Sequence, residues 1–142
     1  MTIETIFNAI RDKVDTDLPS LVPVYDGDIW DDATLPTVSG IVKPFVVFYA
    51  GTSETTKDPR ARGIIGPASD PISYDVMFEA VGATSAIART VFGQVRDILL
   101  GWAPSGSTML KLDSVRGYDI GKTETRPIVY CMAGLFDGIG NL

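Results

Sequence analysis

The chain has 142 residues, of which 45% are hydrophobic and 21% are charged. That composition is typical of a globular protein and excludes disordered and collagen-like classes, and the length favours a single domain over 1–142 because domains commonly hold roughly 100–150 residues. The formal net charge is −6, and the whole excess lies in residues 1–32, which hold eight acids and two bases. An acidic protein repels phosphate, so a function that grips nucleic acid is disfavoured.

Cysteine use and hydropathy bear on the compartment. The single cysteine, Cys131, has no partner for an internal disulfide, so nothing indicates an oxidising compartment. Residues 1–15 mix charges into their apolar positions, unlike a signal peptide. No apolar run approaches the roughly twenty residues that a membrane-spanning helix needs. We therefore expect a soluble protein, made inside the cell and without a membrane partner.

The first predicted element is an amphipathic helix over residues 3–18. Its apolar residues recur at spacings of three and four, which places them on one side of a helix. They are Ile3, Ile6, Phe7, Ile10, Val14 and Leu18. Thr2 is expected to cap the start of the helix and Pro19 to end it. The turn-rich segment 20–40 that follows predicts at most a short strand near residues 24–25.

A strand and a long loop come next. Residues 43–50, KPFVVFYA, are rich in β-branched and aromatic residues and predict a strand that is apolar on both faces. The stretch GTSETTKDPRARGIIGPASDP at 51–71 has neither helical nor alternating periodicity. About twenty residues without structure are uncommon inside a compact domain unless the loop is functional or disordered.

The loop carries an apolar pair, Ile64 and Ile65, after the bases Arg60 and Arg62. Apolar residues at the far end of a polar arm are typical of an element that docks on another chain. These four residues form the candidate assembly arm. The alternative is a surface loop whose isoleucines pack on their own domain.

The C-terminal half predicts a strand and a second helix. Residues 72–80 alternate between apolar and polar, as in a strand with one buried face. An amphipathic helix is predicted to start at Thr84 or Ser85 and to run to about Leu100, with Gly101 at its stop position. Gly93 inside this helix costs about 1 kcal/mol relative to alanine, and we expect it to mark close packing.

Two more strands, 109–120 and 126–136, are joined by a polar turn, and the second is again apolar on both faces. The whole pattern predicts an α+β fold: a mostly antiparallel sheet of four to five strands, two amphipathic helices on one face, and the long loop between two strands. Two helices cover about one face, so the apolar residues of the other face need different cover. Either further copies of the chain provide it, or the long loop and the 20–40 segment fold over it.

The residues that catalysis would require are missing or out of place. The chain has no histidine, which excludes Ser–His, Cys–His and histidine-based zinc sites. Cys131 lies in a β pattern and is expected to be an inert core residue, and nothing orients a dyad of Ser107 and Lys111. GKT at 121–123 ends like a phosphate-binding loop, but Arg116 stands where that loop needs glycine. We therefore predict no enzyme activity, no catalytic or cofactor-binding residue and no cofactor.

The acidic segment DGDIWDD supplies Asp26, Asp28, Asp31 and Asp32. A calcium loop needs an oxygen ligand at its fifth position and glycine at its sixth, and these positions hold Trp30 and Asp31 here. We therefore assign no metal site and interpret the segment as a solvated acidic loop.

In the order of its elements and in their pattern of polar and apolar residues, the chain resembles the tail terminator (tail completion) proteins of long-tailed bacteriophages, particularly those of phages that infect mycobacteria. The resemblance rests on the helix IETIFNAIRDKV, the strand KPFVVFYA with its polar loop, the strand-to-helix run YDVMFEAVGATSAIARTVFGQVRDILLGW, and the closing strands MLKLDSVRGYDI and RPIVYCMAGLF. It covers nearly the whole chain and includes no single fingerprint motif.

The resemblance implies a structural virion protein that is not an enzyme and needs no cofactor. Such proteins form a hexameric ring on the head-proximal end of the tail tube, stop tube polymerisation and present a surface to the head–tail connector or neck protein. The genome passes through without specific binding. Asp26, Asp28, Asp31 and Asp32 would be pore-facing or partner-facing acids, and the arm around Ile64 would contact a neighbouring subunit or the tube. The protein would be assembled in the host cytoplasm and located in the virion.

Three other functions stay open at this point. A head-completion or neck connector protein would sit on the capsid side of the joint. A tube subunit would use more extended β-structure. A small α+β enzyme or ligand-binding domain is the alternative from a different class, because a pocket is invisible in sequence.

Overall fold

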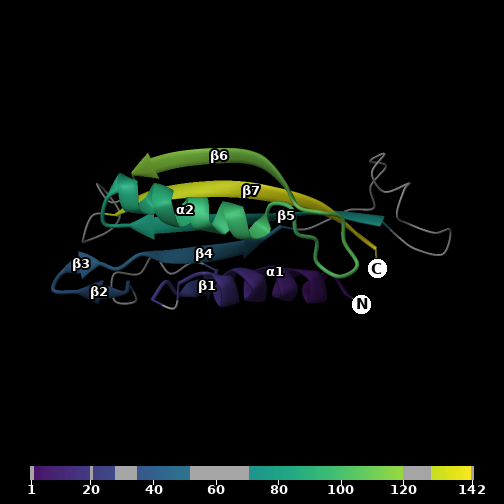
Figure 1. Ribbon diagram of the computed structural model, residues 1–142, viewed down its shortest axis with the longest axis horizontal. Coiled ribbons are helices and arrows are strands. Elements are labelled where there is room, and N and C mark those ends of the chain that lie inside the picture. Colours follow the sequence, from purple (N-terminus) through teal and green to yellow (C-terminus); the bar gives the residue numbers. More distant parts are fainter. Residues whose placement is uncertain (1, 20, 28–34, 52–70, 120–128, 142) are drawn as a thin grey trace.

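The computed structural model describes residues 2–19, 21–27, 35–51, 71–119 and 129–141. Within these ranges it has two helices, α1 (Ile3–Asp17) and α2 (Ser85–Leu99). The strands are β1 (Val24–Asp26), β2 (Thr37–Val38), β3 (Ile41–Val42), β4 (Phe45–Ala50), β5 (Pro71–Gly82), β6 (Lys111–Asp119) and β7 (Tyr130–Asn141). They form a larger sheet of five strands and a hairpin of two (Figure 1).

The larger sheet has the strand order β1-β4-β5-β7-β6. β5 pairs antiparallel with β4 and β7, and β6 pairs antiparallel with β7. β1 pairs with β4 in parallel, with Val24 opposite Val46, so the sheet is mixed. The predicted α+β class is confirmed, and the parallel pair is the departure from a wholly antiparallel sheet. A parallel pair needs a connection that returns the chain to the same end, and the connection from β1 to β4 includes the β2–β3 hairpin.

Both helices pack on the same face of the larger sheet, as their apolar stripes predict (Figure 1). The core on this face includes Phe78 of β5, whose ring centroid lies 5.1 Å from that of Phe48 and 6.2 Å from that of Phe136. The buried helix residues of this core are Ile6, Phe7, Ile10, Val14, Val91, Phe92, Val95 and Leu99. The chain's own helices therefore cover this face.

The ends of α2 follow local chemistry. The Thr84 hydroxyl accepts a 3.2 Å hydrogen bond from the backbone N–H of Ile87, which caps the helix start. Gly101 has φ = +84°, the left-handed conformation that glycine adopts after a helix. The predicted start of α2 at residue 84 or 85 and its predicted stop at Gly101 are confirmed. Thr2 occupies the corresponding position of α1, but its side chain makes no capping hydrogen bond.

The second face of the sheet is covered at one end by the chain itself. Leu35 and Val42, on either side of the hairpin turn, join a buried cluster that also contains Phe45, Val47, Val81, Val129 and Cys131. Leu35 therefore covers this end of the face, as one of the two alternatives predicted for the 20–40 segment. The long loop, which is the other part of that alternative, lies outside the described residues. Cys131 is 3% exposed, which confirms the prediction of a core cysteine.

Two expectations about glycines and strand length are wrong. A Cβ atom added at Gly93 would meet no other atom within 4 Å, so this glycine does not mark close packing. β7 continues to Asn141 instead of ending near residue 136. Its glycines obscured the strand pattern, yet Gly138 has a packing reason, because a Cβ atom there would lie 2.5 Å from the Tyr74 hydroxyl oxygen.

Gly134 of β7 provides a test of how α2 packs on the sheet. A Cβ atom there would overlap the Phe92 ring, whereas a Cβ atom at Gly117 of β6 would have no atom nearer than 3.8 Å. We expect Gly134→Ala to lower the free energy of unfolding by about 2 kcal/mol, because an overpacked core must shift. Gly117→Ala, the matched control, should change it much less. Urea unfolding measures both, and equal stabilities would contradict the described contact between α2 and β7.

Candidate interaction surfaces

Most residues predicted to form the assembly surfaces lie outside the described part of the chain. This applies to all four residues of the candidate arm and to three of the four candidate acids, namely Arg60, Arg62, Ile64, Ile65, Asp28, Asp31 and Asp32. Their predicted roles therefore stay predictions. Asp26 is the candidate whose surroundings are described.

Asp26 ends β1 and is exposed, with a carboxylate oxygen 3.1 Å from a guanidinium nitrogen of Arg11 on α1. Arg11 also lies 3.4 Å from the carboxylate of Asp12. Exposed ion pairs contribute little stability, because water screens them. These contacts nevertheless locate the charges along the outer side of α1 and β1. Among the described residues, no group of acids and cysteines could hold a metal ion.

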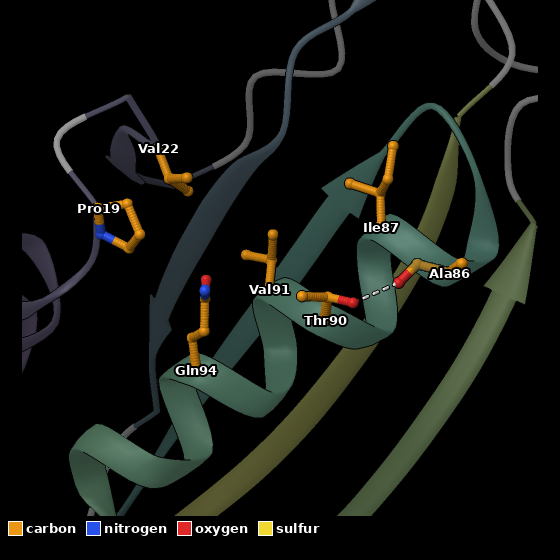
Figure 2. Close-up of a pocket in the computed structure, with 7 residues that line it drawn as sticks. All are labelled: Pro19, Val22, Ala86, Ile87, Thr90, Val91 and Gln94. Atoms are coloured by element: carbon orange, nitrogen blue, oxygen red, sulfur yellow. Dashed lines mark hydrogen bonds between the residues drawn. The ribbon is translucent and has the colours of Figure 1, made fainter.

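An open apolar groove of about 340 Å³ lies between the end of α1 and the first half of α2 (Figure 2). Its lining residues are Pro19, Val22, Ala86, Ile87, Thr90, Val91 and Gln94. The Thr90 hydroxyl donates a 2.9 Å hydrogen bond to the Ala86 carbonyl, so this polar group is engaged within α2. The groove is therefore lined mainly by apolar side chains. A substrate site usually also has several polar groups that converge on the substrate and orient it.

Several large apolar side chains are exposed near the periphery of the fold. Leu21, next to groove residue Val22 in the chain, is 81% exposed, and Ile41 of the hairpin is 61% exposed. Met109, which precedes β6, and Val115 within β6 are 55% and 45% exposed. Isolated exposed apolar residues are normal, but these are among the described positions at which another protein chain could bury apolar area.

The second face of the sheet ends in two opposed acids. Asp75 of β5 pairs in register with Asp137 of β7, which in turn stands opposite Lys111 of β6. The pKa of Asp75 is raised above its ordinary value of 3.8. Loss of hydration is the main cause, and repulsion by Asp137 and Asp113 adds to it. The charged form of Asp75 is therefore disfavoured at this end of the sheet, whereas Asp137 has the base Lys111 opposite it.

Comparison with known proteins adds no family to this picture. Neither a scan against models of protein families nor a search of curated proteins finds a match. Within the described ranges, no helix has both the length and the apolar character required to cross a membrane. The interpretation of the surfaces therefore depends on the residues themselves.

Sequence reasoning missed both the groove and the opposed acids. The groove joins residues 19–22 to residues 86–94, and no local pattern indicates that these segments meet. Asp75 was expected on the polar face of its strand, but its partner Asp137 lies beyond the predicted end of the last strand. Ile139, a β-branched residue beyond the predicted end, was the one signal that could have extended that strand.

The raised pKa of Asp75 gives a pH-dependent prediction. When an acid has a higher pKa in the folded state, its ionised form destabilises the fold above that pKa, and protonation removes the penalty as the pH falls. We expect Asp75→Asn to raise the melting temperature at pH 7. The gain should shrink as the pH falls through the raised pKa of Asp75 and vanish below its ordinary value of 3.8, where Asp75 is protonated in the folded and in the unfolded chain. Thermal denaturation monitored by circular dichroism measures this. Asp15→Asn on α1 is the control, and a gain that is independent of pH would contradict the electrostatic cause.

Proposed function

We propose that this protein is a tail terminator of a long-tailed bacteriophage, which caps the head-proximal end of the tail tube as a ring. The observation that carries the proposal is an α+β fold whose described residues expose large apolar side chains around its periphery, among them Leu21, Ile41 and Met109. Such a surface suits contacts between chains better than turnover of a substrate. The order of helix, strand, long connection, strand, helix and strand pair agrees with the resemblance.

In this proposal the ring acts by shape and needs no cofactor. One side matches the last layer of the tail tube protein, and the other side offers a different surface to the head–tail connector or neck protein. Tube subunits therefore cannot continue to add. A closed ring of six copies makes the stop all-or-none, because a closed ring has no free subunit edge. The genome would pass through without specific binding, and the protein would remain in the virion.

Removal of the gene from its phage tests this function. We expect tails assembled without the protein to carry tubes that are longer than normal and variable in length, because nothing blocks further addition of tube subunits. Negative-stain electron microscopy measures tube length, and complementation with the wild-type protein is the control. Tails of normal length beside unsealed capsids would contradict a terminator and favour a neck connector.

The candidate arm gives a second prediction. Replacing Ile64 and Ile65 together with serine should leave the melting temperature nearly unchanged but reduce capping of tube ends by about tenfold or more. The reason is that each buried isoleucine contributes about 1.5–3 kcal/mol in an apolar contact. The control is the double valine variant, which keeps most of the apolar area. Capping is counted on purified tubes by electron microscopy, and normal capping by the serine variant would refute the role of the arm.

A further inference from the structure

Most charges of the two helices and the two terminal strands lie at opposite lateral edges of the subunit. We define the acidic edge as the outer side of α1 with β1, whose charged residues are Glu4, Arg11, Asp12, Asp15 and Asp26. The basic edge is the outer side of α2 with β6, whose described charged side chains are Arg89, Arg96, Asp97, Lys111, Asp113 and Arg116. The acidic edge thus has four acids and one base, and the basic edge has four bases and two acids. β1 and β6 are the terminal strands of the larger sheet, so the edges lie on opposite sides (Figure 1).

Contacts of α1 establish which of its sides faces outward. Arg11 binds the carboxylate at the end of β1, whereas Lys13 lies on the opposite side, with its Nζ 5.7 Å from the ring centroid of Trp102 beyond α2. Glu4 stands seven residues before Arg11, and Asp15 stands four after it. Helical periodicity therefore places both acids on the same side as Arg11, away from α2.

The groove establishes the orientation of α2 in the same way. Ile87 and Gln94 line the groove that faces the end of α1. Phe92 lies on the other flank of α2 and packs against β7, beyond which β6 follows. Arg89 precedes Phe92 by three residues, and Arg96 follows it by four, so both arginines share that flank. All of the basic edge therefore lies on the β6 side of the molecule.

We propose that the basic edge of one copy binds the acidic edge of the next copy, so that the protein associates head to tail. Each edge carries an excess of one sign, so two identical edges repel across a twofold axis and unlike edges attract, which favours a heterologous contact. Only the closure of such a row into a ring rests on the proposed function; the pairing of the edges follows from their charges.

The outer strands suit this contact. Among the strands in the described ranges, β1 and β6 each have a sheet neighbour on one side only, and open strand edges readily approach another chain. A bulge between Leu112 and Ser114 interrupts β6, and its exposed charges oppose pairing with a copy of itself. Contact of β6 with the acidic edge of another copy avoids that repulsion. Because the charges are exposed, salt should weaken the contact.

Charge reversal tests the proposal with three variants. The first is Arg89→Glu with Arg96→Glu, the second is Glu4→Lys with Asp15→Lys, and the third carries all four changes. Each of the first two should weaken self-association by at least about tenfold, because like charges then meet. The third should restore it, and a mixture of the first two should also associate. Sedimentation velocity at about 50 mM and about 500 mM salt measures this, since screening grows over that range.

Lys43→Glu is the matched control, because Lys43 is an exposed base that belongs to neither edge. Circular dichroism verifies that every variant is folded. A wild-type protein that stays monomeric at low salt, unchanged association of the first two variants, or a loss that the third does not repair would overturn the inference. So would binding of a duplex DNA oligonucleotide that depends on Arg89 and Arg96 while self-association does not.

These results are independent of the proposed function. If removal of the gene leaves tail length normal while the fourfold variant still restores association, the edge contact stands and the terminator function fails. If tubes become overlong without the gene but edge reversal does not affect association, the function stands and the edge contact fails.

Discussion

The register of β5 against its neighbours is the constraint on which the rest of the structure depends. β5 pairs with β7 from Pro71–Asn141 to Gly82–Tyr130, and it pairs with β4 over its second half. Its alternation directs the apolar row Tyr74, Val76, Phe78 and Ala80 toward the helices. A shift of one residue would turn this row to the other face and leave both helices without a core, so helix packing and strand register fix each other.

Because the helices cover only one face of the sheet, the other face has different surroundings at its two ends. At one end, Phe45, Val81 and Cys131 stand side by side in register and lie beneath the hairpin segment. At the other end, Asp75 stands opposite Asp137. The predicted apolar residues of the second face are present at the first of these ends, but the chain covers them itself there, so they leave no surplus for another copy. Among the described residues, the apolar positions left for contacts with other chains are distributed around the periphery.

Structure that depends on residues close together in the sequence, such as helix ends, was predictable. Structure that depends on contacts between residues far apart in the sequence was not. The start of α2 at Thr84 and its stop at Gly101 depend on one capping hydroxyl and one left-handed glycine, so local rules found them. The β2–β3 hairpin is too short for a periodicity, although its turn at Ser39 and Gly40 has the sequence of a turn signal. The parallel direction of β1 and the groove depend on tertiary contacts. Asp26 could be predicted as a surface acid, but not its contact with α1.

The fold places charge that is unevenly distributed along the chain on opposite sides of the subunit. The acidic excess of residues 1–32 is a property of sequence, but α1 and β1 lie together at one side of the sheet, while α2 and β6 lie at the other. If the edges pair as proposed, a dimer always leaves one acidic and one basic edge free, so association continues until a closed ring joins the last two. The number of copies then depends on the angle between the two edges of one subunit. That angle is set by the twist that the sheet accumulates from β1 to β6, because the strands of a sheet rotate progressively in one direction. The interior packing that fixes strand register would thereby also fix the size of the ring.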